Sequence, residues 1–200
     1  MGKNARTHRR NTSRFTGSRG TDSVATGKGA LTRGRRFADG HSLRITWYSN
    51  APWCGTGYGQ QTAQAVTRII KEGHELAIHA MFGLEGSKSN WNGITVYPRG
   101  VAAYSDDIVV AHTQDWANGN PTIPPLLITL FDVWPLLKSK SFHMLPNIAS
   151  WVPIDHKPAP PEVLEWCSRK NVMPIAMSRF GEEMLKAAGV DCLYVPHGIE

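Results

Sequence analysis

The residues best suited to chemistry lie in short polar stretches that each follow an apolar run. The first stretch, "SNAPWCGTGYGQQT", follows "LRITWY" and places Gly55, Gly57 and Gly59 at alternate positions ahead of a helix-like segment. Backbone N–H groups of such a loop, together with the start of the next helix, can bind a phosphate or a sugar hydroxyl. The glycines can equally serve only a tight turn and close packing of the helix. The sequence leaves these two interpretations open.

Two familiar glycine motifs do not fit this loop. A dinucleotide fingerprint needs G-x-G-x-x-G and, about 20 residues later, an acid that binds the ribose. Here the spacing is different, and the next apolar run ends "AIHAMF" without an acid. A P-loop needs Gly-Lys-Ser/Thr, which does not follow. The spacing therefore disfavours a hydride-transfer enzyme and excludes a P-loop.

Two carboxylates and a histidine follow later apolar runs. Asp132 ends the run in "LFDVW", with Trp134 two residues beyond it, and Asp155 and His156 follow in "VPIDHKP". A carboxylate is costly to bury unless it is paired, so Asp132 either belongs to an active site or caps the next turn. Histidine can exchange a proton near neutral pH or bind a sugar hydroxyl, and an indole can stack on a sugar face.

A third polar stretch, "MSRF", contributes Ser178 and Arg179. Ser178 is placed to cap the following helix, with Glu182 near capping-box distance, and this structural role is the favoured one. Arg179 can bind a phosphate or pair with an acid. Tyr58 in the glycine loop and His197 in the closing "VPHGI" complete the predicted substrate-binding residues.

The elements that must position these residues alternate between strands and helices. Strand-like runs begin at residues 43, 75, 94, 124, 147, 172 and 192. Helical patterns follow the glycine loop, "PP" and "MS", and residues 106–119 fit either a helix or a strand. This alternation predicts an α/β fold, a Rossmann-like doubly wound and mostly parallel sheet. Ligands of such sheets bind outside the carboxyl ends of the strands, where the polar stretches lie.

The net charge of +6 is concentrated at the N-terminus. Residues 1–40 hold ten Lys or Arg against two Asp, so the remainder is close to neutral, at −2. We expect residues 1–41 to be a disordered basic tail, because the segment has few large apolar residues. A solubilising or upstream in-frame extension, a nucleic-acid-binding arm and an organellar transit peptide all fit its composition.

Targeting and cofactor signals are weak. The three cysteines lack metal-ligand spacing, and the sequence shows neither an apolar run long enough to span a membrane nor a secretory signal. We therefore predict a cytoplasmic protein without a metal site or a cofactor.

The order of the motifs resembles a known family. "VPIDH", "MSRFGEEML" with "AAG", and "VPHGI", in company with the glycine loop, resemble the N-terminal domain of retaining glycosyltransferases of family four, as found in bacteriophages and bacteria. The resemblance covers about residues 43–200. It implies that residues 42–200 form the N-terminal half of a GT-B architecture, the half that mostly holds the acceptor while a C-terminal half holds the nucleotide-sugar.

The resemblance also implies roles for individual residues. The glycine loop would approach the donor's phosphates or sugar, and His156, with Asp155 adjacent, would face the transferred sugar and be catalytic. The family places the acid after the histidine, whereas here it precedes it. The family's donor-binding acidic motif lies in the second half, so we expect a truncated frame, a fragment or one subunit of a split enzyme. The alternatives are a non-catalytic half-domain that binds a sugar or a protein, and a nucleic-acid-associated protein that acts through its tail.

Overall fold

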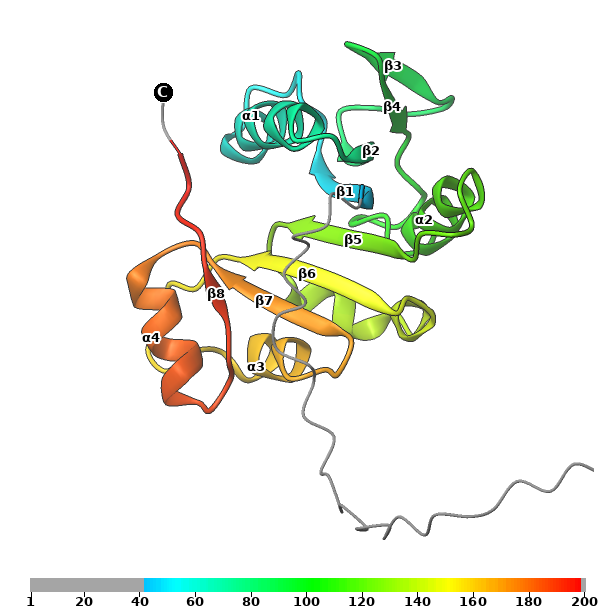
Figure 1. Cartoon of the computed structure of the whole chain (residues 1–200). Coiled ribbons are helices and arrows are strands. Elements are labelled where there is room, and N and C mark those ends of the chain that lie inside the picture. Colours follow the sequence, from blue (N-terminus) through cyan, green and yellow to red (C-terminus); the bar gives the residue numbers. More distant parts are fainter. Residues whose placement is uncertain (1–41, 199–200) are drawn as a thin grey trace, which may run out of the picture. The chain divides into compact units, whose positions relative to one another are not determined.

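The chain folds around one eight-stranded sheet, as a computed structural model describes for residues 42–198 (Figure 1). The predicted tail, residues 1–41, lies outside the described residues. Every neighbouring pair of strands is parallel except β3 and β4. With four α-helices between the strands of the described part, this confirms the predicted Rossmann-like α/β fold. The elements are β1 (Arg44–Asn50), α1 (Gly57–Lys71), β2 (Glu75–Phe82), β3 (Ser89–Trp91), β4 (Ile94–Tyr97), α2 (Val109–Asn118), β5 (Pro125–Leu130), η1 (Trp134–Lys138), η2 (Ser141–Met144), β6 (Asn147–Val152), α3 (Pro161–Cys167), β7 (Val172–Ala176), α4 (Arg179–Ala187) and β8 (Leu193–Tyr194).

The strand order identifies where a ligand belongs. The sheet runs β3-β4-β2-β1-β5-β6-β7-β8, so the chain proceeds outward from β1 in one direction and then from β5 in the other. This reversal places the topological switch point between β1 and β5. The loops that leave the carboxyl ends of these two strands contain the glycine loop and Asp132.

Two apolar cores cover the two faces of the sheet. On one face α1 packs Val66 against a core that includes Trp47 and Trp151, whose residues are 2% and 8% exposed. These two tryptophans are core residues. On the other face α2, α3 and α4 pack against the core that includes Tyr48 and Trp166. Burial on both faces explains the continuous apolar runs of the central strands.

Several boundaries follow from local backbone chemistry. Gly73 and Gly189 have φ values of 88° and 77°, the left-handed conformation in which helices α1 and α4 end. The ambiguous segment at residues 106–119 contains helix α2. Two strands are shorter than the strand-like runs that contain them, "NIASWVPIDH" and "CLYVPHGIE", which were each expected to form one strand. Strand β6 ends at Val152, just before Pro153, and β8 comprises only Leu193 and Tyr194, two residues before Pro196. Proline lacks the N–H that would continue a ladder.

No helix among residues 42–198 is long and apolar enough to cross a bilayer.

Candidate functional site

A cavity of about 380 Å³ opens beside the carboxyl ends of β5 and β6. Four of the residues predicted from the sequence line it together: Asp132, Trp134, Asp155 and His156. The first two follow β5 and the last two follow β6, so neighbouring parallel strands deliver them to one edge of the sheet. The other lining residues are Pro153, Ile154, Pro160, Glu162 and Val163.

Asp155 and His156 interact directly. The Nδ1 atom of His156 lies 2.5 Å from Oδ1 of Asp155, and both side chains are largely exposed. In a strand, successive side chains point to opposite faces, so only one of these two residues could enter the cleft if β6 continued through them. Since β6 ends at Val152, both residues lie in an irregular loop and line the same cavity. A carboxylate hydrogen-bonded to one ring nitrogen of an imidazole fixes the orientation of the ring.

Tyr58 and Asp132 connect the cavity to the glycine loop. Burial, and then the carboxylates of Asp132 and Asp155, raise the pKa of the Tyr58 phenol to about 12. Loss of solvation also raises the pKa of Asp132, with a smaller contribution from Asp155. Tyr58, in the first turn of α1, therefore lies within electrostatic reach of two acids that follow β5 and β6.

Trp134 supplies an aromatic surface to the cavity. It is the first residue of η1 and is 47% exposed, whereas Val133 and Leu136 on either side are fully buried. An edge contact with Tyr104, at 5.8 Å between ring centroids, holds the indole. A fixed and half-exposed indole is the kind of surface on which a sugar ring stacks.

The charges in the cavity favour hydroxyl groups over phosphates. Asp132, Asp155 and Glu162 line it, together with one imidazole, and its lining residues include no Lys or Arg. Carboxylates accept hydrogen bonds from hydroxyls and repel other anions. Glu162 was not predicted from the sequence, although its place in the first turn of α3, just after two prolines, was a usable signal because that turn lies at the same edge of the sheet.

The three glycines of the loop have different reasons to be glycine. A Cβ atom on Gly59 would lie 2.3 Å from the carbonyl oxygen of Cys54 and 3.0 Å from that of Ala51, so close packing requires glycine there. A Cβ atom on Gly55 or Gly57 would meet nothing within 4 Å, and neither residue needs a positive φ. The packing interpretation therefore accounts for Gly59 and leaves Gly55 and Gly57 as exposed backbone that a ligand can approach.

The loop is held in one shape. Thr56 caps α1: its Oγ1 accepts hydrogen bonds from the Gly59 N–H at 3.0 Å and from the Asn50 amide at 2.9 Å. The indole of Trp53 donates to the carbonyl of Gly83 at 2.9 Å, which ties the loop to the end of β2. A rigid loop lowers the entropy cost of binding an anion at its N–H groups.

The remaining predicted residues lie outside the cavity lining. Ser178 caps α4 by accepting the Gly181 N–H at 3.0 Å, and Glu182 pairs with Arg179 and Lys186 and does not close a capping box. The Arg179 guanidinium also stacks over Tyr194 at 3.8 Å. His197 makes an edge contact with Trp151 on the opposite face of the sheet, with ring centroids 4.7 Å apart.

Among residues 42–198, no group of three or more His, Cys, Asp or Glu side chains is placed to hold a metal ion. The placement of the residues is the basis for a functional proposal, because no protein-family model and no curated protein matches the chain.

Proposed function

We propose that this chain forms the acceptor-binding half of a retaining glycosyltransferase of the GT-B type. The observation that carries the proposal is the cavity beside β5 and β6, which combines the half-exposed indole of Trp134 with three carboxylates and a histidine. The sequence resemblance to family four points the same way. The cavity lies at the carboxyl edge of the sheet, one strand away from the switch point between β1 and β5 where ligands of doubly wound sheets bind.

Different side chains of the cavity would make different contacts with an acceptor. A sugar ring or other polyol would stack on Trp134, and its hydroxyls would donate hydrogen bonds to Asp132, Asp155 and Glu162. A hydroxyl that attacks the donor must lose its proton. Asp132 is suited to accept it, because burial raises the pKa of this carboxyl and so makes it a stronger base.

The donor would approach from the glycine loop. Exposed N–H groups at Gly55 and Gly57 and the positive end of the α1 dipole suit the leaving diphosphate, which the acidic cavity would repel. A second domain would supply the opposite wall and hold the nucleotide. The two substrates would then meet beside Tyr58, between loop and cavity.

Saturation-transfer NMR of the full chain with uncharged oligosaccharides tests the acceptor half. We expect binding that weakens about 3- to 10-fold in Trp134→Ala, in line with the loss of one aromatic stacking contact. Phe180→Ala is the matched control, because Phe180 is also an exposed aromatic residue, at 38%, and lies on α4 outside the cavity. Equal affinity of both variants would refute the acceptor site.

Transfer itself is tested by adding a donor-binding GT-B half and a panel of nucleotide-sugars. We expect turnover only in the mixture, and a loss of turnover in His156→Ala and Asp155→Ala. Turnover by the 200-residue chain alone would overturn the half-enzyme proposal. Sugar binding without turnover under any combination would instead support a non-catalytic sugar-binding domain.

A further inference from the structure

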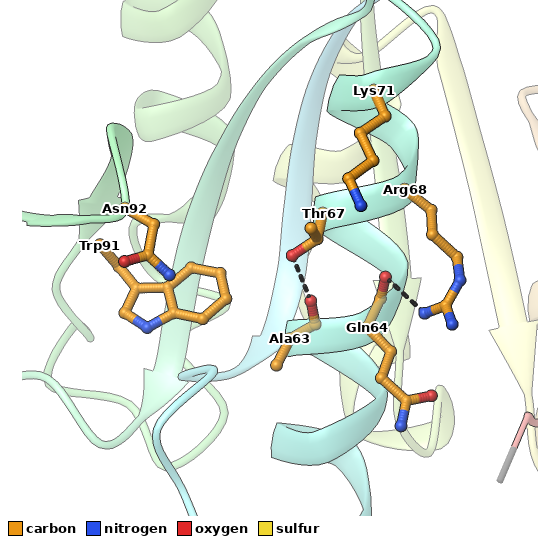
Figure 2. A pocket seen from close by; sticks show the side chains of 7 residues that line it. All are labelled: Ala63, Gln64, Thr67, Arg68, Lys71, Trp91 and Asn92. Carbon is orange, nitrogen blue, oxygen red and sulfur yellow. Dashed lines mark hydrogen bonds between the residues drawn. The ribbon is translucent and has the colours of Figure 1, made fainter. Parts of the chain in front are cut away.

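A second hollow, a groove of about 410 Å³, lies between α1 and the β3–β4 hairpin (Figure 2). We call it the α1 groove. It shares no lining residue with the cavity beside β5 and β6. Its lining comprises Ala63, Gln64, Thr67, Arg68 and Lys71 of α1 and Trp91 and Asn92 of the hairpin.

Both walls of the α1 groove are well defined. On the helix side, Gln64, Arg68 and Lys71 follow one another at spacings of four and three residues, which places them on one stripe of α1. On the hairpin side, Asn92 and Gly93 form a tight turn with φ values of 51° and 87°, and the Asn90 side chain accepts the Gly93 N–H at 2.9 Å.

The side chains of the α1 groove are of three chemical kinds. Trp91 packs partly against the apolar core, and Figure 2 shows its indole reaching from the hairpin toward α1. Gln64 and Asn92 carry amides, which both donate and accept hydrogen bonds. Arg68 and Lys71 carry positive charges, and the lining contains no acid. Figure 2 shows the Lys71 ammonium turned back along the helix toward Thr67.

The positive charge of the α1 groove is local. Residues beyond the N-terminal forty carry a net charge of −2, so a general basic field of the folded part does not explain two cations beside an indole. An aromatic surface, amides and cations in one groove match the three parts of a nucleotide: a flat base, a polar edge and a phosphate.

We infer that the α1 groove binds a nucleotide unit, with the base against Trp91, the amides of Gln64 and Asn92 on the polar edges, and the phosphate at Lys71 and Arg68. The same chemistry is offered by a free mononucleotide and by one residue of a single strand. The inference does not depend on sugar transfer, because none of these residues belongs to the cavity proposed to hold the acceptor.

Isothermal titration of the full chain at 150 mM salt tests the inference. The probes are adenosine and guanosine 5′-monophosphate, ribose 5-phosphate, which has no base, and a single strand of ten nucleotides. We expect a mononucleotide to bind and ribose 5-phosphate not to bind. Trp91→Leu keeps apolar bulk in the core and should weaken binding at least about 5-fold, the effect of losing one base-stacking contact. Trp91→Phe should restore most of it.

Lys71→Ala provides a second variant that leaves the core untouched. It should weaken mononucleotide binding about 3- to 10-fold through the loss of one charge-assisted contact. Lys170→Ala is its matched control, because Lys170 is an exposed lysine before β7, outside the α1 groove. A single strand that binds more tightly, with the same losses in Trp91→Leu and Lys71→Ala, would support the inference and assign the nucleotide to a strand. Three results would each overturn the inference. The first is equal binding of ribose 5-phosphate and mononucleotides, the second is an equal loss of affinity in Lys71→Ala and Lys170→Ala, and the third is unchanged binding in Trp91→Leu.

Discussion

Alanine at Gly57 and at Gly59 should have opposite consequences, although both residues lie in the first turn of α1. Gly59 is buried beneath the loop, and a methyl group there would lie 2.3 Å from the Cys54 carbonyl oxygen and 3.0 Å from the Ala51 carbonyl oxygen. At Gly57 the same methyl group would project into open space. The pair therefore separates the packing role of the glycine loop from its binding role.

The expected magnitudes follow from these contacts. Relief of the Gly59 overlap requires a backbone shift, because both obstructing atoms are main-chain oxygens. Overpacking of this kind costs about 2–3 kcal/mol, which corresponds to a fall in Tm of roughly 5–10 °C for a domain of this size. Gly57→Ala should stabilise the fold by about 0.5 kcal/mol, since alanine loses less chain entropy and needs no unusual φ.

Thermal unfolding followed by circular dichroism measures the first effect, and NMR titration of backbone amides measures the second. Inorganic pyrophosphate is the probe, because it carries the charge of the donor's diphosphate and lacks the base required in the α1 groove. We expect shifts of the Gly55 and Gly57 amides in the parent chain and an affinity about tenfold lower in Gly57→Ala. An unchanged Tm in Gly59→Ala would refute the packing account, and unchanged affinity in Gly57→Ala would refute the binding account.

Three further outcomes are expected from groups with shifted pKa values or capping roles. Burial, and then the neighbouring His112, lower the pKa of His79 to about 3, so its unfolded form binds the proton first and stability is lost as the pH falls below about 6.5. Urea unfolding should show about 2 kcal/mol less stability at pH 5 than at pH 6.5. His79→Asn should reduce that dependence, and a dependence as steep as that of the parent chain would contradict the assignment to His79. Asp132→Asn should lower the pKa of Tyr58, measured by ultraviolet titration, without returning it to 10, because burial is the larger cause of the shift. An unchanged pKa of Tyr58 would show that the Asp132 carboxylate does not act on the phenol. Ser178→Ala should lower the free energy of unfolding by about 1 kcal/mol, because the helix cap is lost, and should leave sugar affinity unaltered. A variant with unchanged stability and weaker sugar binding would instead show that Ser178 binds the ligand.

The architecture could be predicted because its signals are local. Buried parallel strands have continuous apolar runs. The helices between them follow the N-cap residues Thr56, Pro160 and Ser178, and α1 and α4 are each followed by a glycine, so the sequence shows both the apolar periodicity and the residues that start and stop each helix. The end of β6 and the length of β8 were harder to predict. The apolar stretch continues past Val152, and only the hydrogen-bond pattern of the folded sheet shows that β6 stops pairing before Pro153.

The candidate site could be predicted in part, for a topological reason. Residues that follow neighbouring parallel strands share one edge of the sheet, which brought Asp132, Trp134, Asp155 and His156 into one cavity. The same rule does not assign residues to the two faces of the sheet. Strand order and helix placement set the side of each connection, so nothing in the sequence separated His197 from the cavity.

Long-range contacts formed the features that the sequence did not reveal. The α1 groove joins a helix to a hairpin about 20 residues further along the chain. The buried His79 and the half-buried His112, with Nδ1 atoms 2.9 Å apart, join β2 to α2. In neither case are the contacting residues separated by a fixed sequence spacing, so no sequence motif predicts the contact. Periodicity identifies the face that a residue occupies, whereas these sites depend on which two faces meet.

The two hollows have opposite electrostatic preferences, and this contrast limits what each can bind. Three carboxylates in the cavity beside β5 and β6 oppose any ligand that brings phosphates with it, while the α1 groove holds two cations and no acid. A nucleic acid presented as acceptor would place its backbone phosphates against Asp132, Asp155 and Glu162. Under the proposed function, the acceptor most compatible with the cavity is therefore an uncharged polyol. Anionic ligands would go to the N–H groups of the glycine loop or to the α1 groove.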